Sequence, residues 1–258
     1  MKQRPSFPVR LDTSPMRAGA VPARATATAI QGVPEQARPQ GLGMDSAAIR
    51  LRMVQLLERQ GVRDTLVLQA MGSVERHRFV DSALVNQAYE DTSLPIGLGQ
   101  TISKPGVVAR MLELLRNGKT GRLGRVLEIG TGCGYQAAVL SHLATEVYSV
   151  ERLRGLHEKA RGNLRYLRLA NLHLLLGDGM LGCAQGAPYA AIVSAAGGET
   201  LPQQWVDQLA MGGRLVAPVV HPQQKGGQCL LVLDKTPQGI QQSLLESVHF
   251  VPLKSGLA

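Results

Sequence analysis

The fold is decided by a run of ten residues, Val126-Leu-Glu-Ile-Gly-Thr-Gly-Cys-Gly-Tyr135. An apolar stretch typical of a buried parallel strand leads directly into glycines at 130, 132 and 134, and a helical pattern follows. Glycines at such a turn let the backbone bend tightly and approach a ligand that a Cβ atom would exclude. The run therefore predicts a strand, a ligand-binding turn and a helix, in that order.

Residues downstream of this turn alternate between short apolar runs and helical patterns. We expect strands at 125 to 129, 146 to 150, 172 to 176, 189 to 195, 214 to 220 and 228 to 233, and helices at 135 to 143, 152 to 169 and 202 to 210. Such alternation is typical of βαβ units. The predicted fold class is α/β, with a mostly parallel, Rossmann-like sheet covered by helices on both faces.

Residues upstream of the turn have a helical character. A first helix is expected from Asp45 with Gly61 at its C-terminal cap, a second from Asp64 to Met71, and a third over 82 to 89. A glycine-rich run over 96 to 103 interrupts the periodicity, and a further helix begins at Pro105. We predict one domain over 44 to 258, with a helical lid region at 44 to 124 and the core at 125 to 258.

The N-terminal residues 1 to 43 differ in composition from the rest of the chain. They contain six prolines and carry +4 of the net charge of +9, without helical or strand periodicity. Such a segment buries too little apolar surface to offset the entropy of ordering. We predict a disordered, basic, proline-rich arm. Two alternatives are a tether for nucleic acid or a partner, and a true translation start at Met44.

Several classes of protein are excluded by composition and spacing. Three widely spaced cysteines do not resemble a disulfide framework, and the six histidines show neither H-x-x-x-H nor H-E-x-x-H spacing. The sequence contains no run of 18 apolar residues and no secretory signal. We therefore expect reduced thiols, no metal site, no membrane segment and a cytoplasmic location.

Acidic residues follow or precede the glycine turn at positions that suit a nucleoside ligand. Glu128 stands two residues before the first glycine, Glu151 ends the next strand, and Asp178 lies in Gly177-Asp-Gly179 after the third. In open α/β sheets, ligands bind at the carboxyl ends of such strands. Each feature has a structural alternative, namely a plain strand-to-helix turn, a helix cap or a tight turn. Their occurrence together favours a binding site.

The sequence resembles the protein-L-isoaspartate O-methyltransferase family over residues 46 to 254. The most specific motif is Tyr89-Glu-Asp91 followed by Leu94-Pro-Ile-Gly-Leu-Gly-Gln-Thr-Ile-Ser-Lys-Pro105, which looks like the family's lid over substrate and cofactor. Further matches are 128 to 139, Val150-Glu151, Gly177-Asp-Gly179, Ala187-Pro-Tyr189, 212 to 215 and 250 to 253.

This resemblance implies a class I methyltransferase that uses S-adenosyl-L-methionine, releases S-adenosyl-L-homocysteine, and methylates the free carboxylate of L-isoaspartyl residues in damaged proteins. It implies Ser103 as the active-site residue. It implies cofactor contacts from Gln100, Thr101, Ile102, Glu128, Gly130, Thr131, Gly132, Gly134, Glu151, Arg152, Asp178 and Gly179. We further expect a monomer with no specific nucleic-acid partner.

Three positions depart from the family pattern. Ala190 stands where Asp is usual, Cys133 where Ser or Ala is usual, and Lys254 where many members have a smaller polar residue. Two alternatives for the whole chain stay open. One is a methyltransferase for nucleic acid or a small molecule, which the basic charge suggests, and the other is a non-catalytic binding protein on the same fold.

Overall fold

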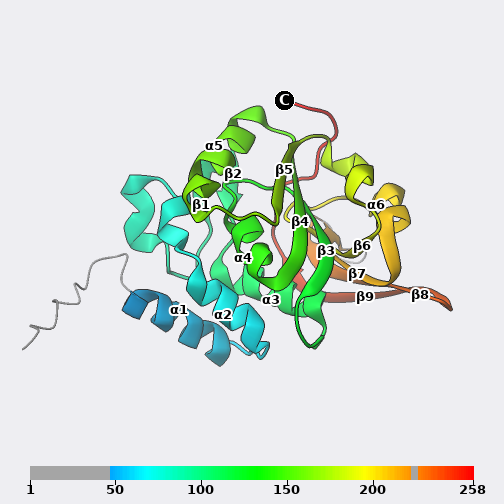
Figure 1. Ribbon diagram of the computed structural model, residues 1–258, viewed down its shortest axis with the longest axis horizontal. Coiled ribbons are helices and arrows are strands. Elements are labelled where there is room, and N and C mark those ends of the chain that lie inside the picture. Colours follow the sequence, from blue (N-terminus) through cyan, green and yellow to red (C-terminus); the bar gives the residue numbers. More distant parts are fainter. Residues whose placement is uncertain (1–46, 222–225) are drawn as a thin grey trace, which may run out of the picture. The chain divides into compact units, whose positions relative to one another are not determined.

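The computed structural model describes residues 47–221 and 226–258, which all fall within one compact unit (Figure 1). The predicted arm lies outside the described residues, so its disorder and its boundary at residue 43 stay predictions. Among the described helices, none is long and apolar enough to cross a membrane.

The centre of the domain is a seven-stranded sheet with the order β5-β4-β3-β6-β7-β8-β9. The first five strands in this order are mutually parallel, and the last two pair antiparallel. The strands are β3(Leu123–Ile129), β4(Ala144–Glu151), β5(Leu172–Leu176), β6(Tyr189–Ser194), β7(Leu209–Val220), β8(Gln228–Thr236) and β9(Gly239–Val248). All six predicted core strands are present, and the mostly parallel sheet is confirmed.

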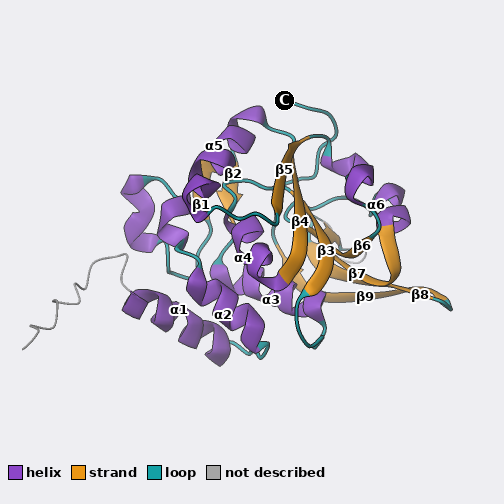
Figure 2. Cartoon of the chain, in the orientation of Figure 1, coloured by secondary structure: helices purple, strands orange, loops and turns teal. Residues whose placement is uncertain are grey.

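Helices cover both faces of this sheet, as predicted, but unequally (Figure 2). Side chains alternate along β3, so Val126 joins the core on one face and Leu127 the core on the other. The first face is covered by α3(Pro105–Arg116), α4(Tyr135–Leu143) and α5(Arg154–Leu164). The helices α1(Ala47–Arg59) and α2(Thr65–Ser73) pack on α3 and α4 from outside. The second face is covered mainly by α6(Gln203–Gln208), whose Trp205 is fully buried.

The N-terminal helices follow the predicted caps. Asp64 caps α2, because its Oδ1 accepts hydrogen bonds from the backbone N–H groups of Leu66 at 3.0 Å and Val67 at 3.2 Å. Gly61 follows α1 with φ +106°, a conformation that favours glycine. The third helix, predicted over 82 to 89, is instead a 3₁₀ turn, η2(Ser82–Gln87), and another 3₁₀ turn, η1(Arg76–Phe79), precedes it.

Other elements differ from the sequence predictions. The glycine-rich run forms a small antiparallel hairpin of β1(Leu94–Gly97) and β2(Gln100–Ile102), and β9 was not predicted at all. The helix expected over 152 to 169 ends at Leu164 and continues only as a 3₁₀ turn, η3(Arg165–Leu167), which Arg168 stops with a left-handed φ of +48°. Two more 3₁₀ turns are η4(Gly179–Leu181) and η5(Ala184–Gly186).

Candidate active site

A cavity of about 480 Å³ opens at the carboxyl ends of β3 and β4, between the glycine turn and the β1–β2 hairpin. This is the edge at which a doubly wound sheet binds its ligands. Most of the predicted site residues come together in its wall: Gln100, Thr101, Ile102, Ser103, Gly130, Thr131, Gly132, Glu151, Arg152 and Gly179. Glu128, Gly134 and Asp178 are not part of that wall.

The glycine turn approaches the cavity closely at one position. Gly132 has φ +56°, and a Cβ atom there would lie 3.2 Å from Cδ1 of Ile96 in the hairpin. Gly134 has a different role, because a Cβ atom there would lie 2.7 Å from Cδ1 of Leu164. The third glycine therefore permits packing of α4 against α5, while the second permits the hairpin to approach the glycine turn closely.

Glu151 links the glycine turn to the start of α5. Its side chain is 5% exposed, and its two oxygens accept hydrogen bonds from the backbone N–H groups of Gly132 and Leu153, both at 2.9 Å. The first bond orients the turn and the second caps the helix region, so the structural alternative for Glu151 is present. Each carboxylate oxygen keeps a second acceptor position, and Glu151 still lines the cavity.

Glu128 is buried behind the turn rather than in the cavity. Strand alternation directs it away from Ile129, which does line the cavity, and toward Ser149, whose hydroxyl donates to Glu128 Oε2. Ser149 also bonds Thr131 at 2.6 Å, and Thr131 lines the cavity. Burial raises the pKa of Glu128 to about 8, against the opposing hydrogen bond from Ser149. Glu128 thus supports the cavity wall through Ser149 and Thr131.

Asp178 is engaged by the C-terminal segment of the chain. Its Oδ1 caps Met180 N at 2.9 Å, and its Oδ2 accepts from Gly256 N at 2.6 Å. Arg152 Nε in turn donates to Gly256 O at 2.9 Å. The last residues therefore lie between Asp178 and Arg152, which explains why Asp178 is absent from the cavity wall.

The β1–β2 hairpin lies over the cavity and contacts α5 at two points. Leu98 at its tip is 61% exposed, and a Cβ atom at Gly155 of α5 would lie 3.0 Å from Leu98 Cδ1. Lys159 Nζ, also on α5, donates to Ile96 O at 2.9 Å and to Asp81 Oδ1 at 3.0 Å. Lys159 thus joins α5 to the hairpin and to η2, at whose N-cap Asp81 stands.

A second cavity of about 890 Å³ adjoins the first. It lies between the N-terminal end of α3 and the segment that follows β9, and its wall contains charged groups of both signs: Asp91, Lys104, Arg110 and Glu246. Arg110 Nε and Glu246 Oε1 are 2.7 Å apart and join α3 to β9. The two cavities share four wall residues, namely Thr101, Ser103, Ala195 and Val251.

Ser103 stands at this junction and is half-buried. Its alternative role as a cap for α3 is filled by other residues, because the N-cap is Lys104 and Asp91 Oδ1 accepts from Gly106 N at 2.6 Å. The backbone carbonyl of Ser103 accepts from Arg76 Nη2 at 2.7 Å. The hydroxyl is thus held beside both cavities by its own backbone.

Comparison with known proteins agrees with this geometry. The model of the family "Protein-L-isoaspartate(D-aspartate) O-methyltransferase (PCMT)" matches residues 49–258. The chain belongs to this family. The protein-L-isoaspartate O-methyltransferase of Methylibium petroleiphilum is 56% identical over 98% of this chain and 96% of its own length. That of Leptothrix cholodnii is 57% identical over 92% of this chain and 85% of its own length.

Solved structures of the same family have the same fold. A protein-L-isoaspartate O-methyltransferase with 28% identity superposes with a TM-score of 0.72, covering 81% of this chain and 67% of the other. A second, from Plasmodium falciparum and in complex with S-adenosyl-L-homocysteine, has 26% identity and a TM-score of 0.68 over 80% of this chain and 98% of the other. The class I methyltransferase fold is therefore confirmed.

The departures from the family pattern fall in different places. Ala190 on β6 lies beside Gly124 on β3, where an added Cβ atom would be 3.1 Å away, and it lines neither cavity. Cys133 and Lys254 both line the first cavity. Burial raises the pKa of the Cys133 thiol to about 11, so the thiol stays protonated near neutral pH. Among the described residues, no three His, Cys, Asp or Glu side chains are grouped so as to hold a metal ion.

Sequence reasoning missed several residues around the protein-L-isoaspartate methyltransferase site. Val251, Pro252 and Leu253 line the first cavity although they are distant from the glycine turn in sequence. Arg76 binds Ser103 from a 3₁₀ turn that was not predicted from the sequence. The motif match at 250 to 253 could have indicated Val251, Pro252 and Leu253. No signal distinguished Arg76 from its neighbour Arg78, since burial alone separates them.

Proposed function

We propose that the two cavities divide one reaction between them, with S-adenosyl-L-methionine in the first and the isoaspartyl chain in the second. The observation that carries this proposal is the junction at Ser103, where the two walls meet. The reaction of this family transfers a methyl group to a carboxylate, so the two groups have to meet. The shared wall of the two cavities gives them a place to do so. The chain is a protein-L-isoaspartate O-methyltransferase, which initiates repair of damaged proteins.

The residues of the first cavity suit the cofactor. A volume of about 480 Å³ falls within the range of small-molecule sites, roughly 300 to 1,000 Å³. Gly132 lines the cavity without a side chain, and Glu151 offers buried acceptor positions for ribose hydroxyls. Thr131 and Gln100 add polar groups to the wall. When bound, the cofactor supplies a methyl group activated by a sulfonium.

The reaction needs alignment more than acid or base chemistry. The free carboxylate of an isoaspartyl residue is an anion at neutral pH, so its oxygen is already a nucleophile. Ser103 is proposed to donate a hydrogen bond that orients this carboxylate, not to attack covalently. Among the described residues, no histidine or carboxylate is hydrogen-bonded to its hydroxyl, as activation of a serine nucleophile would require. Such alignment lowers the entropic cost of bringing the carboxylate and the methyl donor together.

We propose that the partners are isoaspartyl proteins and peptides, and that the enzyme is a cytoplasmic monomer without a specific nucleic-acid partner. The free thiols of Cys133, Cys183 and Cys229 support a reducing compartment. The mixed charges of the second cavity favour a polypeptide over a nucleic acid, because Asp91 and Glu246 would repel phosphates.

One assay tests this function. The full chain is incubated with tritium-labelled S-adenosylmethionine and either an isoaspartyl peptide or its normal aspartyl twin. Label is expected only in the isoaspartyl peptide, as a base-labile ester. Duplex DNA, RNA and intact ribosomes serve as alternative acceptors. Label in any of these but not in the peptide would replace the proposal with the nucleic-acid alternative, and cofactor binding without any transfer would favour a non-catalytic protein.

A further inference from the structure

Arg76 is a buried cation that makes no direct ion pair among the described residues, although the charge of Asp91 acts on it from a longer distance. Its side chain is 0% exposed, and among the described residues its hydrogen bonds go to backbone carbonyls, those of Ala88 at 2.8 Å and Ser103 at 2.7 Å. Nη1 is buried without any partner. Burial lowers the pKa of Arg76 from its ordinary value. Burying an unpaired charge and an unsatisfied donor is costly, so a purely structural role would be met better by an apolar side chain.

The contacts of Arg76 join three segments that each border the active site. Ala88 precedes Tyr89-Glu-Asp91, and Ser103 stands at the junction of the cavities. The guanidinium carbon also lies 4.7 Å from the ring centre of Tyr135, the first residue of α4 after the glycine turn. Tyr135 itself lines the first cavity. One side chain therefore connects the lid, the substrate side and the cofactor side.

The position of Arg76 relative to the substrate follows from the same contacts. Arg76 lines neither cavity, so it does not touch a ligand. Its positive charge nevertheless lies directly behind the backbone of Ser103, in a dry environment where charges are weakly screened. An anionic carboxylate beside Ser103 would be attracted by that charge through one layer of protein.

We propose that Arg76 is a positioning residue for methyl transfer, which clamps the Ser103 backbone against the glycine turn and supplies a buried positive charge behind the substrate carboxylate. This inference rests on the proposed function of the two cavities. Arg76 then makes two separate contributions, a clamp on the backbone and a positive charge. The forked guanidinium makes the clamp, because it bonds two carbonyls at once, whereas the charge alone could be provided by lysine.

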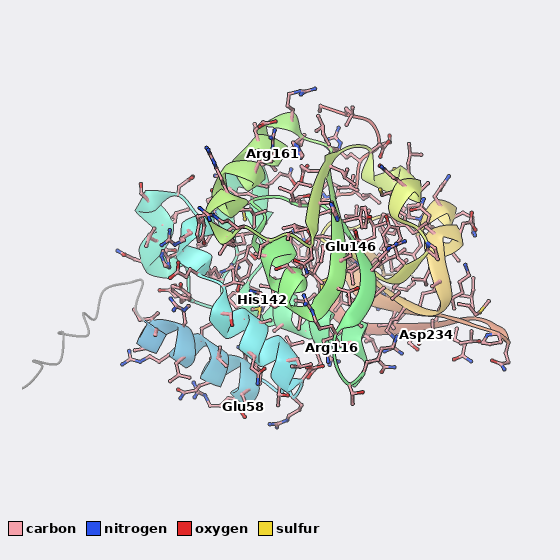
Figure 3. The ribbon with its side chains drawn as sticks, viewed as in Figure 1. Glu58, Arg116, His142, Glu146, Arg161 and Asp234 are labelled. Carbon is pink, nitrogen blue, oxygen red and sulfur yellow. The ribbon has the colours of Figure 1, made fainter. Side chains whose placement is uncertain are left out.

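The test compares two buried arginines. Arg116, labelled in Figure 3, lies near the end of α3 and is 2% exposed, and it bonds the carbonyls of Gly121 and Lys119 in addition to Asp64. It lines neither cavity, so it is a matched control. Arg76→Lys, Arg76→Met and Arg116→Lys are assayed in the full chain, well below their thermal midpoints, for kcat, KM of an isoaspartyl peptide and cofactor affinity.

The clamp predicts that both Arg76 variants lose kcat on the order of 10²-fold, since a displacement of about 1 Å can cost that much. The charge predicts that KM for the peptide rises about 10-fold in Arg76→Met and stays near the wild-type value in Arg76→Lys. Cofactor affinity should change less than about threefold in both variants, which is under 0.7 kcal/mol. Arg116→Lys should lower the thermal midpoint while kcat and KM stay within about twofold.

The outcomes separate this inference from the proposed function. Equal loss of kcat in Arg76→Lys and Arg116→Lys, or wild-type kcat in a folded Arg76→Lys, would overturn the positioning role while the function stands. If Arg76→Met does not fold, Arg76→Lys alone decides the clamp. Wild-type protein that binds cofactor but never methylates the peptide would overturn the function, and the positioning role with it.

Discussion

At the residue scale, Ser103 and Glu151 are the two side chains whose geometry allows the most direct tests. The wild-type structure gives Ser103 no role as a helix cap, since Asp91 bonds the free N–H of Gly106. Ser103→Ala should therefore leave the thermal midpoint nearly unchanged and lower single-turnover rates on the order of 10²-fold. A loss of about 1 kcal/mol in stability with normal turnover would instead identify Ser103 as a cap.

Ser103→Thr is the matched control for this prediction. It keeps the hydroxyl and adds one methyl group beside a cavity, so part of the rate should return. Cofactor affinity is measured for both variants by calorimetry and should stay within about threefold, or under 0.7 kcal/mol. A large change in affinity would show that Ser103 binds the cofactor rather than the substrate.

Glu151 has two separable roles. Its Oε2 holds Gly132 N and its Oε1 holds Leu153 N, both at 2.9 Å, and we predict that the remaining acceptor positions bind the ribose. Glu151→Gln keeps one acceptor oxygen but removes the charge, and charge-assisted bonds contribute about 1.5 to 3 kcal/mol. Affinity for S-adenosylhomocysteine should therefore fall about 10- to 100-fold in calorimetry. Unchanged affinity in a folded variant would restrict Glu151 to backbone support.

At the element scale, the β1–β2 hairpin is predicted to act as a flap that retains the cofactor. Lys159 on α5 holds Ile96 O at 2.9 Å and is partly exposed, so its removal affects the flap more than the core. Lys159→Ala should raise the dissociation rate of S-adenosylhomocysteine about 2- to 10-fold, which corresponds to one ordinary hydrogen bond. Arg161→Ala on the same helix is the control, since Arg161 pairs only with Glu158 among the described residues.

The measurement for the flap is a stopped-flow chase of bound cofactor. Association rates should change less than dissociation rates, because the bond between Lys159 and the hairpin acts to retain a ligand that is already bound. Equal dissociation rates in Lys159→Ala and Arg161→Ala would mean that the hairpin does not retain the ligand.

The C-terminal segment is a second element with a predicted effect on the cofactor. The backbone N–H of Gly256 donates a hydrogen bond to Asp178 Oδ2. We predict that the same carboxylate accepts a hydrogen bond from the adenine amine of the cofactor. Deletion of residues 256 to 258 should free this acceptor and tighten S-adenosylhomocysteine about 2- to 10-fold, the gain of one hydrogen bond. The analogue with inosine in place of adenosine lacks the amine and should gain nothing. Equal changes in affinity for both ligands would contradict a hydrogen bond between Asp178 and the adenine amine.

Sequence periodicity predicted the buried elements and failed for the exposed ones. The parallel strands each contain a short run of mostly apolar residues because both of their faces are covered, and all were predicted. β9 is an edge strand with nearly every residue exposed, and Ile240, Leu244 and Leu245 do not alternate, so nothing in its sequence required a strand. The hairpin was missed for a related reason, since its turn depends on positive φ at Gly97, Leu98 and Gly99.

The same contrast holds for the site. Motif spacing predicted residues near the glycine turn because they are local in sequence, and Ser103 through the family's lid motif. The direction of a side chain cannot be read from motif spacing. Glu128 was therefore expected to contact the cofactor, whereas the pleat of β3 directs its side chain behind the glycine turn. Arg76 required knowledge of burial, which arises only when the lid packs on α4.

At the scale of the whole molecule, charge is unevenly distributed along the chain. Residues 1 to 43 carry +4 of the total +9 and lie outside the described residues. Every wall residue of both cavities lies beyond them. We therefore predict that the arm is dispensable for chemistry, and that its charge affects encounter with acidic proteins more than catalysis.

Stability of the whole domain should depend on pH through Glu128. Its pKa is raised from 4.5 to about 8 by burial, so between these values the folded protein holds a proton that the unfolded chain releases. The stability that this group contributes is fully present below about pH 4.5 and is lost progressively as pH rises toward 8. Glu128→Gln mimics the protonated form and should gain thermal stability relative to wild type as pH rises from 6 to 9.

The measurement is the difference in thermal midpoint between variant and wild type at each pH, because other groups titrate in both proteins and cancel in the difference. Glu58→Gln is the control: Glu58 is an exposed residue of α1, labelled in Figure 3, and its difference curve should be flat. For Glu128→Gln the difference should grow by several degrees between pH 6 and pH 9, since about 1 kcal/mol moves the midpoint of a domain this size by about 2 to 4 °C. A flat curve would mean that Glu128 is ionised in the folded protein and accepts the hydrogen bond from Ser149 as a carboxylate rather than as a carboxylic acid.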